Sequence, residues 1–220
     1  MPRIRRLIPE NGPLHIMCRG NNRKNILEFV EEKSTYLKLL SKYLDENHIS
    51  INHYCLMDNH LHLIVWLESK STLSRFMMQV DLSYFHYFTK KYNYCGHLWQ
   101  NRFESSIIDS ERYLLQCAKY IELNPVRAGI VEYPCQYRFS SFRFYAVGES
   151  DCLITPNPLF LELAQSQYQR QLRYRKLVVK ESIKTNLNQE FIGDSEYVTK
   201  MEDLFQIKSK GKKRGRPKQK

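Results

Sequence analysis

The sequence predicts an α+β fold in which helices pack on one side of a four- or five-stranded antiparallel sheet. Three observations favour this fold over a doubly wound nucleotide-binding fold. Few segments have the character of strands, two long segments each carry a single apolar helical face, and the chain lacks a Gly-rich loop that joins a strand to a helix. We expect residues 1–150 to form this unit.

The first half of the unit contains three predicted strands and one helix. Residues 14–19 are a short strand candidate, and the polar, basic loop RGNNRKN follows. Residues 31–47 have helical spacing, because their apolar side chains can share one face. Residues 49–57 and 60–67 then form a hairpin in the middle of the sheet, around a turn that its Asp and Asn residues favour.

The second half begins with a long amphipathic helix over residues 71–93. Its predicted buried side consists of Leu73, Phe76, Met77, Val80, Tyr84 and Phe88. Residues 103–108 are a further strand candidate, and residues 110–123 form a helix with Ser110 as its N-cap. This helix is expected to end near Asn124, because Pro125 disfavours helical geometry in the residue before it.

Beyond this unit, residues 151–205 are expected to form a helical extension with breaks at Pro156, Pro158 and Gly193. Residues 206–220 contain eight basic residues and no acidic one, so the rest of the chain carries only +3 of the net charge of +11. Such a tail repels itself and stays disordered until a polyanion neutralises it. The tail residues expected to bind nucleic acid are Lys212, Lys213, Arg214 and Arg216.

The R-G-R-P sequence at 214–217 resembles the core of an AT-hook, which lies in the minor groove of A·T-rich DNA. A tail that only keeps the protein in solution is the alternative interpretation.

Composition excludes several classes of protein. The longest apolar runs, such as residues 61–67, are too short to cross a bilayer, and the N-terminus lacks the apolar stretch of a secretion signal. The six cysteines are scattered and form no C-x-x-C pair, which favours reduced thiols over a disulfide framework. We therefore expect a cytoplasmic protein without a membrane partner.

His60 and His62 are candidate metal ligands. Residues i and i+2 of a strand point to the same face, with Cα atoms about 6.5–7 Å apart, so two imidazoles can converge on one ion. A metal site would also need a third ligand and an open coordination position. Two partly buried structural histidines are the alternative interpretation of this pair.

Tyr120 and Asn124 lie four residues apart and therefore share a helix face. A tyrosine hydroxyl can attack a phosphate that a metal polarises, and an amide oxygen is a suitable ligand for a hard metal ion. The alternatives are ordinary, because the chain has 15 tyrosines and because Asn before Pro is a common helix terminator.

Three segments resemble the signature blocks of the REP-associated tyrosine transposases, which belong to the HUH endonuclease superfamily. They are YCLMDNHLHLIV (54–65), GHLWQNRF (96–103) and YIELNPVRAGIV (120–131). RGNNRKNI (19–26) and SSFRFY (140–145) also resemble that family in order and spacing. The resemblance covers most of residues 12–150.

The resemblance implies a ferredoxin-like α+β fold with a central antiparallel sheet. It implies that His60 and His62 hold a divalent metal, Mg²⁺ or Mn²⁺, and that Tyr120 is the nucleophile. Asn124 matches the position of a third polar ligand. The chain departs from the family at Asp58, where the family commonly has Pro, and the expected consequence is either an altered turn or a charge near the metal.

The implied reaction cuts and rejoins single-stranded or hairpin DNA through a 5′-phosphotyrosine bond, by a protein that acts as a monomer or a homodimer. Bound DNA needs basic partners, for which the expected residues are Arg19, Arg23, Lys24, Arg102 and Arg127. Two alternatives remain open: a hairpin-binding protein that has lost cleavage, and a nuclease that uses water as its nucleophile.

Overall fold

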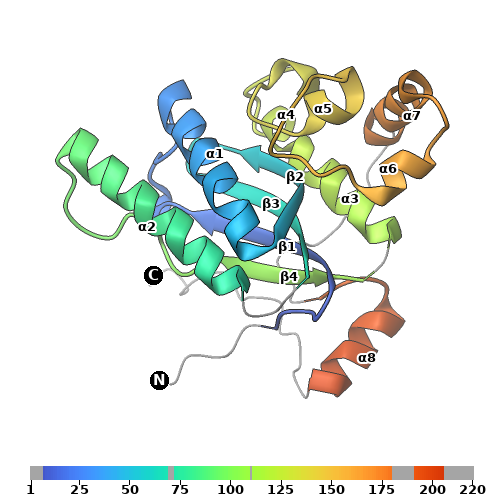
Figure 1. Ribbon diagram of the computed structural model, residues 1–220, viewed down its shortest axis with the longest axis horizontal. Coiled ribbons are helices and arrows are strands. Elements are labelled where there is room, and N and C mark those ends of the chain that lie inside the picture. The colour runs from blue at the N-terminus through green and yellow to red at the C-terminus, as the bar shows by residue number, and fades with distance from the viewer. Residues whose placement is uncertain (1–6, 69–71, 110, 180–190, 206–220) are drawn as a thin grey trace, which may run out of the picture.

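The computed structural model describes residues 7–68, 72–109, 111–179 and 191–205 (Figure 1). The expected N-cap Ser110 and the basic tail over residues 206–220 lie outside this range.

Five strands form a single sheet in the order β2-β3-β1-β4-β5. The strands are β1 (Gly12–Arg19), β2 (Ile49–Leu56), β3 (His60–Leu67), β4 (Glu104–Ile108) and β5 (Phe191–Ile192). The first four pair in antiparallel fashion, whereas β5 runs parallel to β4. With helices after β1 and after β3, these four strands have the βαββαβ connectivity of a ferredoxin-like unit, as the resemblance implied.

The hairpin of β2 and β3 does not lie in the middle of the sheet, as the sequence led us to expect. β3 is an inner strand, but β2 is an outer strand. Later parts of the chain cover its outer edge, because Cys55 forms a bridge with Ser140 and Ile51 forms one with Ile154. This cover explains why β2 is as buried as an inner strand.

Helices α1 (Val30–Leu44) and α2 (Thr72–Tyr92) lie side by side on one face of the sheet (Figure 1). All six residues predicted for the inner side of α2 are buried. The 3₁₀ turns η1 (Asn21–Arg23) and η2 (Asp45–Asn47) follow β1 and α1. Leu61 and Leu63 of β3 are fully buried and belong to the core that these helices share.

The opposite face carries α3 (Glu111–Glu122), so the prediction that helices pack on only one side is wrong. Alternation along β3 places His62 on the face opposite to Leu61 and Leu63, and the His62 ring contacts Tyr120 of α3. A central strand with side chains to bury on both faces needs a helix on each.

Pro125 does more than end α3. It lies in the first turn of a separate short helix, α4 (Asn124–Arg127), where a missing backbone N–H costs nothing. The structure then continues through η3 (Pro134–Gln136), α5 (Phe142–Val147), α6 (Pro158–Glu162), α7 (Gln167–Val179) and α8 (Ser195–Phe205).

The expected helical extension contains an element that the sequence did not predict. The two residues of β5 extend the sheet beyond β4, so this segment is not wholly helical. Pro158 begins α6 instead of breaking a helix, with the Asn157 side chain accepting a hydrogen bond from the backbone of Leu159 as N-cap. Within the described ranges, every helix is too short or too polar to cross a membrane.

Candidate active site

The two histidines at the start of β3 lie close together, as their spacing predicts. The ring centroids of His60 and His62 are 5.1 Å apart and the rings are nearly perpendicular. His62 is buried, whereas His60 is partly exposed at the end of the strand. The pair therefore has one ring within the fold and one at its surface.

Hydrogen bonds fix which nitrogen of His60 carries the proton. Its Nδ1 lies 2.6 Å from Oδ1 of Asn59, and the Asn59 Nδ2 donates to the carbonyl oxygen of Arg23. An amide oxygen can only accept, so His60 donates from Nδ1. The lone pair on His60 Nε2 is then free.

His62 has its own partner, which the sequence analysis missed. Nδ1 of His62 lies 2.9 Å from Nε2 of His15, a buried residue of β1. One proton serves this pair, and when His62 donates it, the lone pair on His62 Nε2 is also free. The two rings meet because of the register between β1 and β3, which the sequence does not show. The alternation of side chains along β1 is the one local signal that could have placed His15 on the same face as His62.

The surroundings keep these three imidazoles uncharged at neutral pH. Burial lowers the pKa of His15 to about 4. Burial and, to a smaller extent, the positive charge of Arg19 lower the pKa of His60 to about 4. The negative charge of Asp58 has a weaker effect in the opposite direction. Burial and the neighbouring His15 and His60 hold the pKa of His62 well below its usual range. A neutral imidazole is the form that binds metals.

Tyr120 approaches the histidines from α3. Its ring centroid is 6.3 Å from that of His62, and its side chain is partly exposed. The guanidinium of Arg127 lies 4.6 Å from the Tyr120 ring centroid, and its Nη1 donates to the Tyr120 carbonyl oxygen at 3.0 Å. A partly exposed phenol with a cation over its ring suits a reaction that develops negative charge there.

Asn124 begins the next short helix and is half-buried. Its side-chain Nδ2 is buried without a hydrogen-bond partner, so no hydrogen bond from Nδ2 fixes the orientation of this amide. Within the described residues, no three His, Cys, Asp or Glu side chains are arranged to hold a metal. An amide oxygen, water and substrate phosphate are oxygen donors that Mg²⁺ and Mn²⁺ accept beside two imidazoles.

One predicted basic residue lies beside the histidines, and a second shares a pocket with it. Arg19 is the register partner of His60, and Met17 is the partner of His62. Arg19 and Arg102 line a small pocket, together with Met17, Gln100, Asn101 and Glu104.

The remaining predicted basic residues are more scattered. Arg23 and Lys24 are exposed in the loop after β1, and Nζ of Lys24 lies 4.3 Å from the Tyr94 ring centroid. Arg127 is exposed beside Tyr120. Lys212, Lys213, Arg214 and Arg216 lie outside the described residues.

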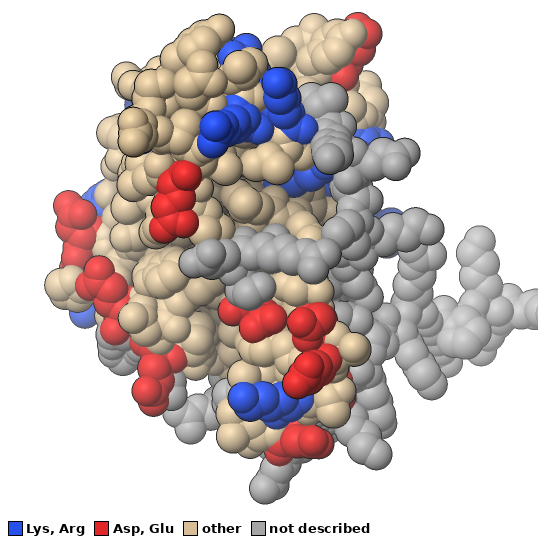
Figure 2. Space-filling view, turned by 90° about the vertical axis from the view of Figure 1, so that its right-hand side faces the viewer, with Lys and Arg blue, Asp and Glu red and all other residues tan. Residues whose placement is uncertain are grey.

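Helix α7 adds a basic surface that the sequence analysis missed. It carries Arg170, Arg173, Arg175 and Lys176 and no acidic residue. Figure 2 shows the side of the molecule that carries α7 and α8, with Lys and Arg gathered in its upper part and Asp and Glu mostly lower down.

The charge of Asp58, where the chain departs from the family pattern, is compensated. Nζ of the buried Lys33 lies 2.6 Å from its Oδ1. The same ammonium group also donates to the carbonyl oxygen of Glu28. The turn before His60 is therefore held by an ion pair.

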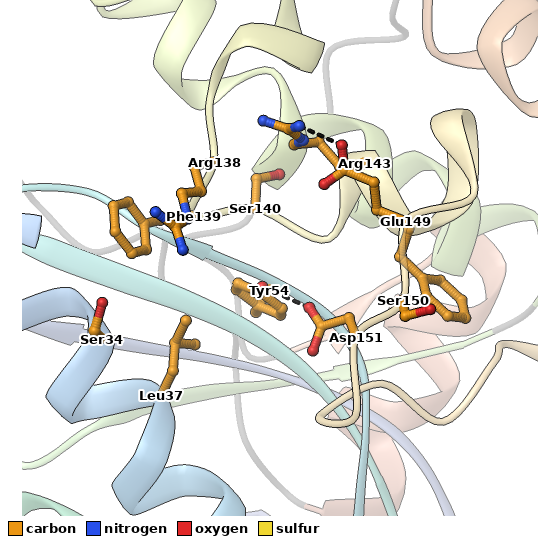
Figure 3. A pocket seen from close by; sticks show the side chains of 11 residues that line it. Ser34, Leu37, Tyr54, Arg138, Phe139, Ser140, Arg143, Glu149, Ser150 and Asp151 are labelled. Atoms are coloured by element: carbon orange, nitrogen blue, oxygen red, sulfur yellow. Dashed lines mark hydrogen bonds and ion pairs between the residues drawn. The ribbon is translucent and has the colours of Figure 1, made fainter.

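A separate pocket of about 320 Å³ lies at the outer strand of the sheet (Figure 3). Tyr54 of β2, which lines it, is the register partner of Leu63 and so faces away from His62. In this pocket Arg143 pairs with Glu149, and the Tyr54 hydroxyl donates to Asp151 at 2.7 Å. This pocket is not part of the histidine site.

Comparison with known proteins gives matches to transposases. The family described as "Transposase IS200 like" matches residues 10–124. The solved structure of a REP-associated tyrosine transposase bound to a REP hairpin is similar, with 21% identity over 71% of this chain and 93% of that chain and a TM-score of 0.57. A putative transposase from Deinococcus radiodurans R1 is similar at 16% identity, over 56% of this chain and 96% of that chain, with a TM-score of 0.39. No curated protein has a matching sequence.

Proposed function

The chain belongs to the IS200-like transposase family, and from this premise we propose that it cuts and rejoins single-stranded, hairpin-associated DNA through a covalent bond to Tyr120. One observation carries the proposal. The Tyr120 ring lies 6.3 Å, between ring centroids, from His62, whose ring lies 5.1 Å from that of His60. A nucleophile and a metal-binding pair so close together suit phosphoryl transfer better than binding alone.

The proposed metal ligands are Nε2 of His60, Nε2 of His62 and the amide oxygen of Asn124. Because Nδ1 of His60 donates to Asn59 and Nδ1 of His62 can donate to His15, both rings can offer Nε2 to the same ion. A bound Mg²⁺ or Mn²⁺ would neutralise charge on the phosphate oxygens and would keep water or phosphate as further ligands.

In the proposed reaction, the Tyr120 oxygen attacks the scissile phosphorus in line and the bond to the 3′ oxygen breaks. The phenol proton leaves to solvent, the departing 3′ oxygen takes up a proton from solvent, and the products are a 5′-phosphotyrosine and a free 3′-hydroxyl. Arg127 lies over the ring and favours the negative charge that develops on the phenol oxygen. Attack by a second 3′-hydroxyl then restores Tyr120 and joins new strands.

The proposed substrate is DNA with exposed bases and a folded hairpin. A similar structure is that of a transposase bound to a REP hairpin, which supports a hairpin partner for this chain. Arg19, the register partner of His60, and Arg102 would hold phosphates at the pocket that they both line. Arg23, Lys24 and the four tail residues Lys212, Lys213, Arg214 and Arg216 would add weaker contacts to the backbone.

The test uses a labelled single-stranded hairpin oligonucleotide with Mg²⁺ or Mn²⁺. A covalent protein–DNA adduct on a denaturing gel is expected from the wild type and from Tyr168→Phe, whose ring is 64% exposed on α7. Tyr120→Phe should form none. Strand cutting that survives Tyr120→Phe would identify water as the nucleophile. Hairpin binding without an adduct under either metal would instead indicate a protein that binds but does not cut.

A further inference from the structure

The turn of α3 that carries Tyr120 also carries a buried carboxylate. Glu122 is fully buried and accepts hydrogen bonds from three side chains. Its Oε1 accepts from the Ser141 hydroxyl at 2.6 Å and lies 3.1 Å from Nδ1 of His53, while its Oε2 accepts from the Tyr174 hydroxyl at 2.8 Å. The proposed chemistry gives none of these groups a role.

The direction of each hydrogen bond in this cluster follows from its neighbours. Asn157 accepts from the backbone of Leu159 through Oδ1, so its Nδ2 faces Nε2 of His53 and donates to it. His53 therefore carries its proton on Nδ1 and donates to Glu122. The carboxylate accepts from Ser141, His53 and Tyr174, so both of its oxygens are held by hydrogen bonds.

Helix α7 contacts this turn of α3 at two positions. Tyr174 reaches Glu122, and Nζ of Lys119 donates to the carbonyl oxygen of Leu177 at 3.1 Å. Residues 119 and 122 lie on either side of Tyr120 in the sequence, and 122 also precedes the proposed ligand Asn124. A rotation or shift of α3 that moved Tyr120 would break both contacts.

Stacked rings restrict the movement of Tyr174 itself. Its ring lies 5.1 Å from that of Tyr145 at an angle of 29°, and the Tyr145 ring lies 4.4 Å from that of His53 at 22°. Tyr174, Tyr145 and His53 are all buried. The stack joins α7 to the sheet through β2, so α7 has a fixed position from which to hold α3.

We propose that α7 is a positioning element for the nucleophile, with Tyr174 and Lys119 setting where α3 presents Tyr120 to the histidines. This inference rests on the proposed function. It assigns a role to residues beyond position 124, where the family match ends, because Ser141, Asn157 and Tyr174 all lie after it.

The first test compares Tyr174→Phe with Tyr168→Phe, the same change at an exposed position of the same helix. Adduct formation is measured in a single turnover with saturating hairpin DNA, at a temperature at which both variants remain folded. Since a misplacement of about 1 Å can cost about a hundredfold in rate, Tyr174→Phe should react at least about tenfold more slowly. The DNA concentration for half-saturation should not change. An unchanged rate, even with a lower melting temperature, would overturn the proposal.

Lys119→Met provides a second variant if Tyr174→Phe does not fold, and the same fall in rate is expected from it. Amide hydrogen exchange gives a readout that needs no chemistry. Exchange over residues 117–124 should accelerate in Tyr174→Phe and stay unchanged in Tyr168→Phe. A wild type that forms no adduct would refute the proposed function alone, whereas equal exchange in both variants would refute the positioning role of α7.

Discussion

Replacing His15 tests the organisation of the proposed metal site most directly. In the wild type, Nε2 of the buried His15 lies 2.9 Å from Nδ1 of His62. His15→Leu removes this acceptor and leaves a donor of His62 buried without a partner. A buried donor that loses its partner costs about 1–3 kcal/mol, part of which the apolar leucine offsets. The larger effect should be on metal binding, because the His62 ring loses the contact that holds its orientation.

Loss of a hydrogen-bond partner of a metal ligand typically weakens metal binding about ten- to hundredfold. We therefore expect His15→Leu to raise the dissociation constant for Mn²⁺ by that factor. Electron paramagnetic resonance measures the free Mn²⁺ remaining at each point of a titration, without DNA or activity. Urea unfolding of the same samples checks that the variant is folded.

His15→Gln is the matched control, since the glutamine side chain can place an oxygen acceptor near the position of Nε2. This variant should bind Mn²⁺ within a few-fold of the wild type. If His15→Leu binds Mn²⁺ as tightly as the wild type, His15 does not orient His62 for metal binding. If the glutamine and leucine variants lose the same affinity, loss of ring packing explains both, and the hydrogen bond from His62 to His15 has no such role.

Three further predictions concern charged residues around the site and the helices. Asp58→Ala should lower the free energy of unfolding by about 1.5–3 kcal/mol in urea, because the buried Lys33 loses its carboxylate, whereas an unchanged midpoint would show that the pair contributes nothing. Lys91→Met should destabilise the protein at pH 7. Burial raises the pKa of Glu32, but the hydrogen bonds from Lys91 and Tyr92 outweigh this and hold it below 4.5, so the stabilisation is present above that pH and is lost as the pH falls through the folded-state pKa. The difference in free energy of unfolding between wild type and Lys91→Met, measured in urea, should therefore disappear in acid. A difference that persists at pH 2 would contradict this. Arg102→Met should reduce the slope of log affinity against log salt for a single-stranded oligonucleotide by about 0.7, and an unchanged slope would mean that Arg102 contacts no phosphate.

Local patterns in the sequence were sufficient for most elements of the fold. The inner side of α2 was predicted residue by residue, because a 3.6-residue period fixes which side chains share a face. The turn before His60 and the alternation along β3 were equally local. Strand alternation also predicted that His60 and His62 share a face, and their rings lie 5.1 Å apart.

The sequence could not show which elements would lie next to one another. The prediction that helices cover one face was wrong for α3, and β5 was missed because two residues carry no periodic signal. His15 lies 47 residues from His62 in the sequence, so their hydrogen bond depends on the pairing of β1 with β3. The contact of Tyr174 with Glu122 spans 52 residues and likewise had no local signal.

The amino-acid sequence by itself determined most of the helices and strands, the excess of positive charge in the tail, and the residue types from which a metal-dependent nucleophilic site can be assembled. The tertiary structure decided that Tyr120 meets His62, that His15 can select the protonated nitrogen of that ring, and that α7 holds α3. The physical reason is the range of each effect. Periodicity and turn preferences act over a few residues, whereas hydrogen bonds between buried groups depend on strand register and helix packing over the whole chain.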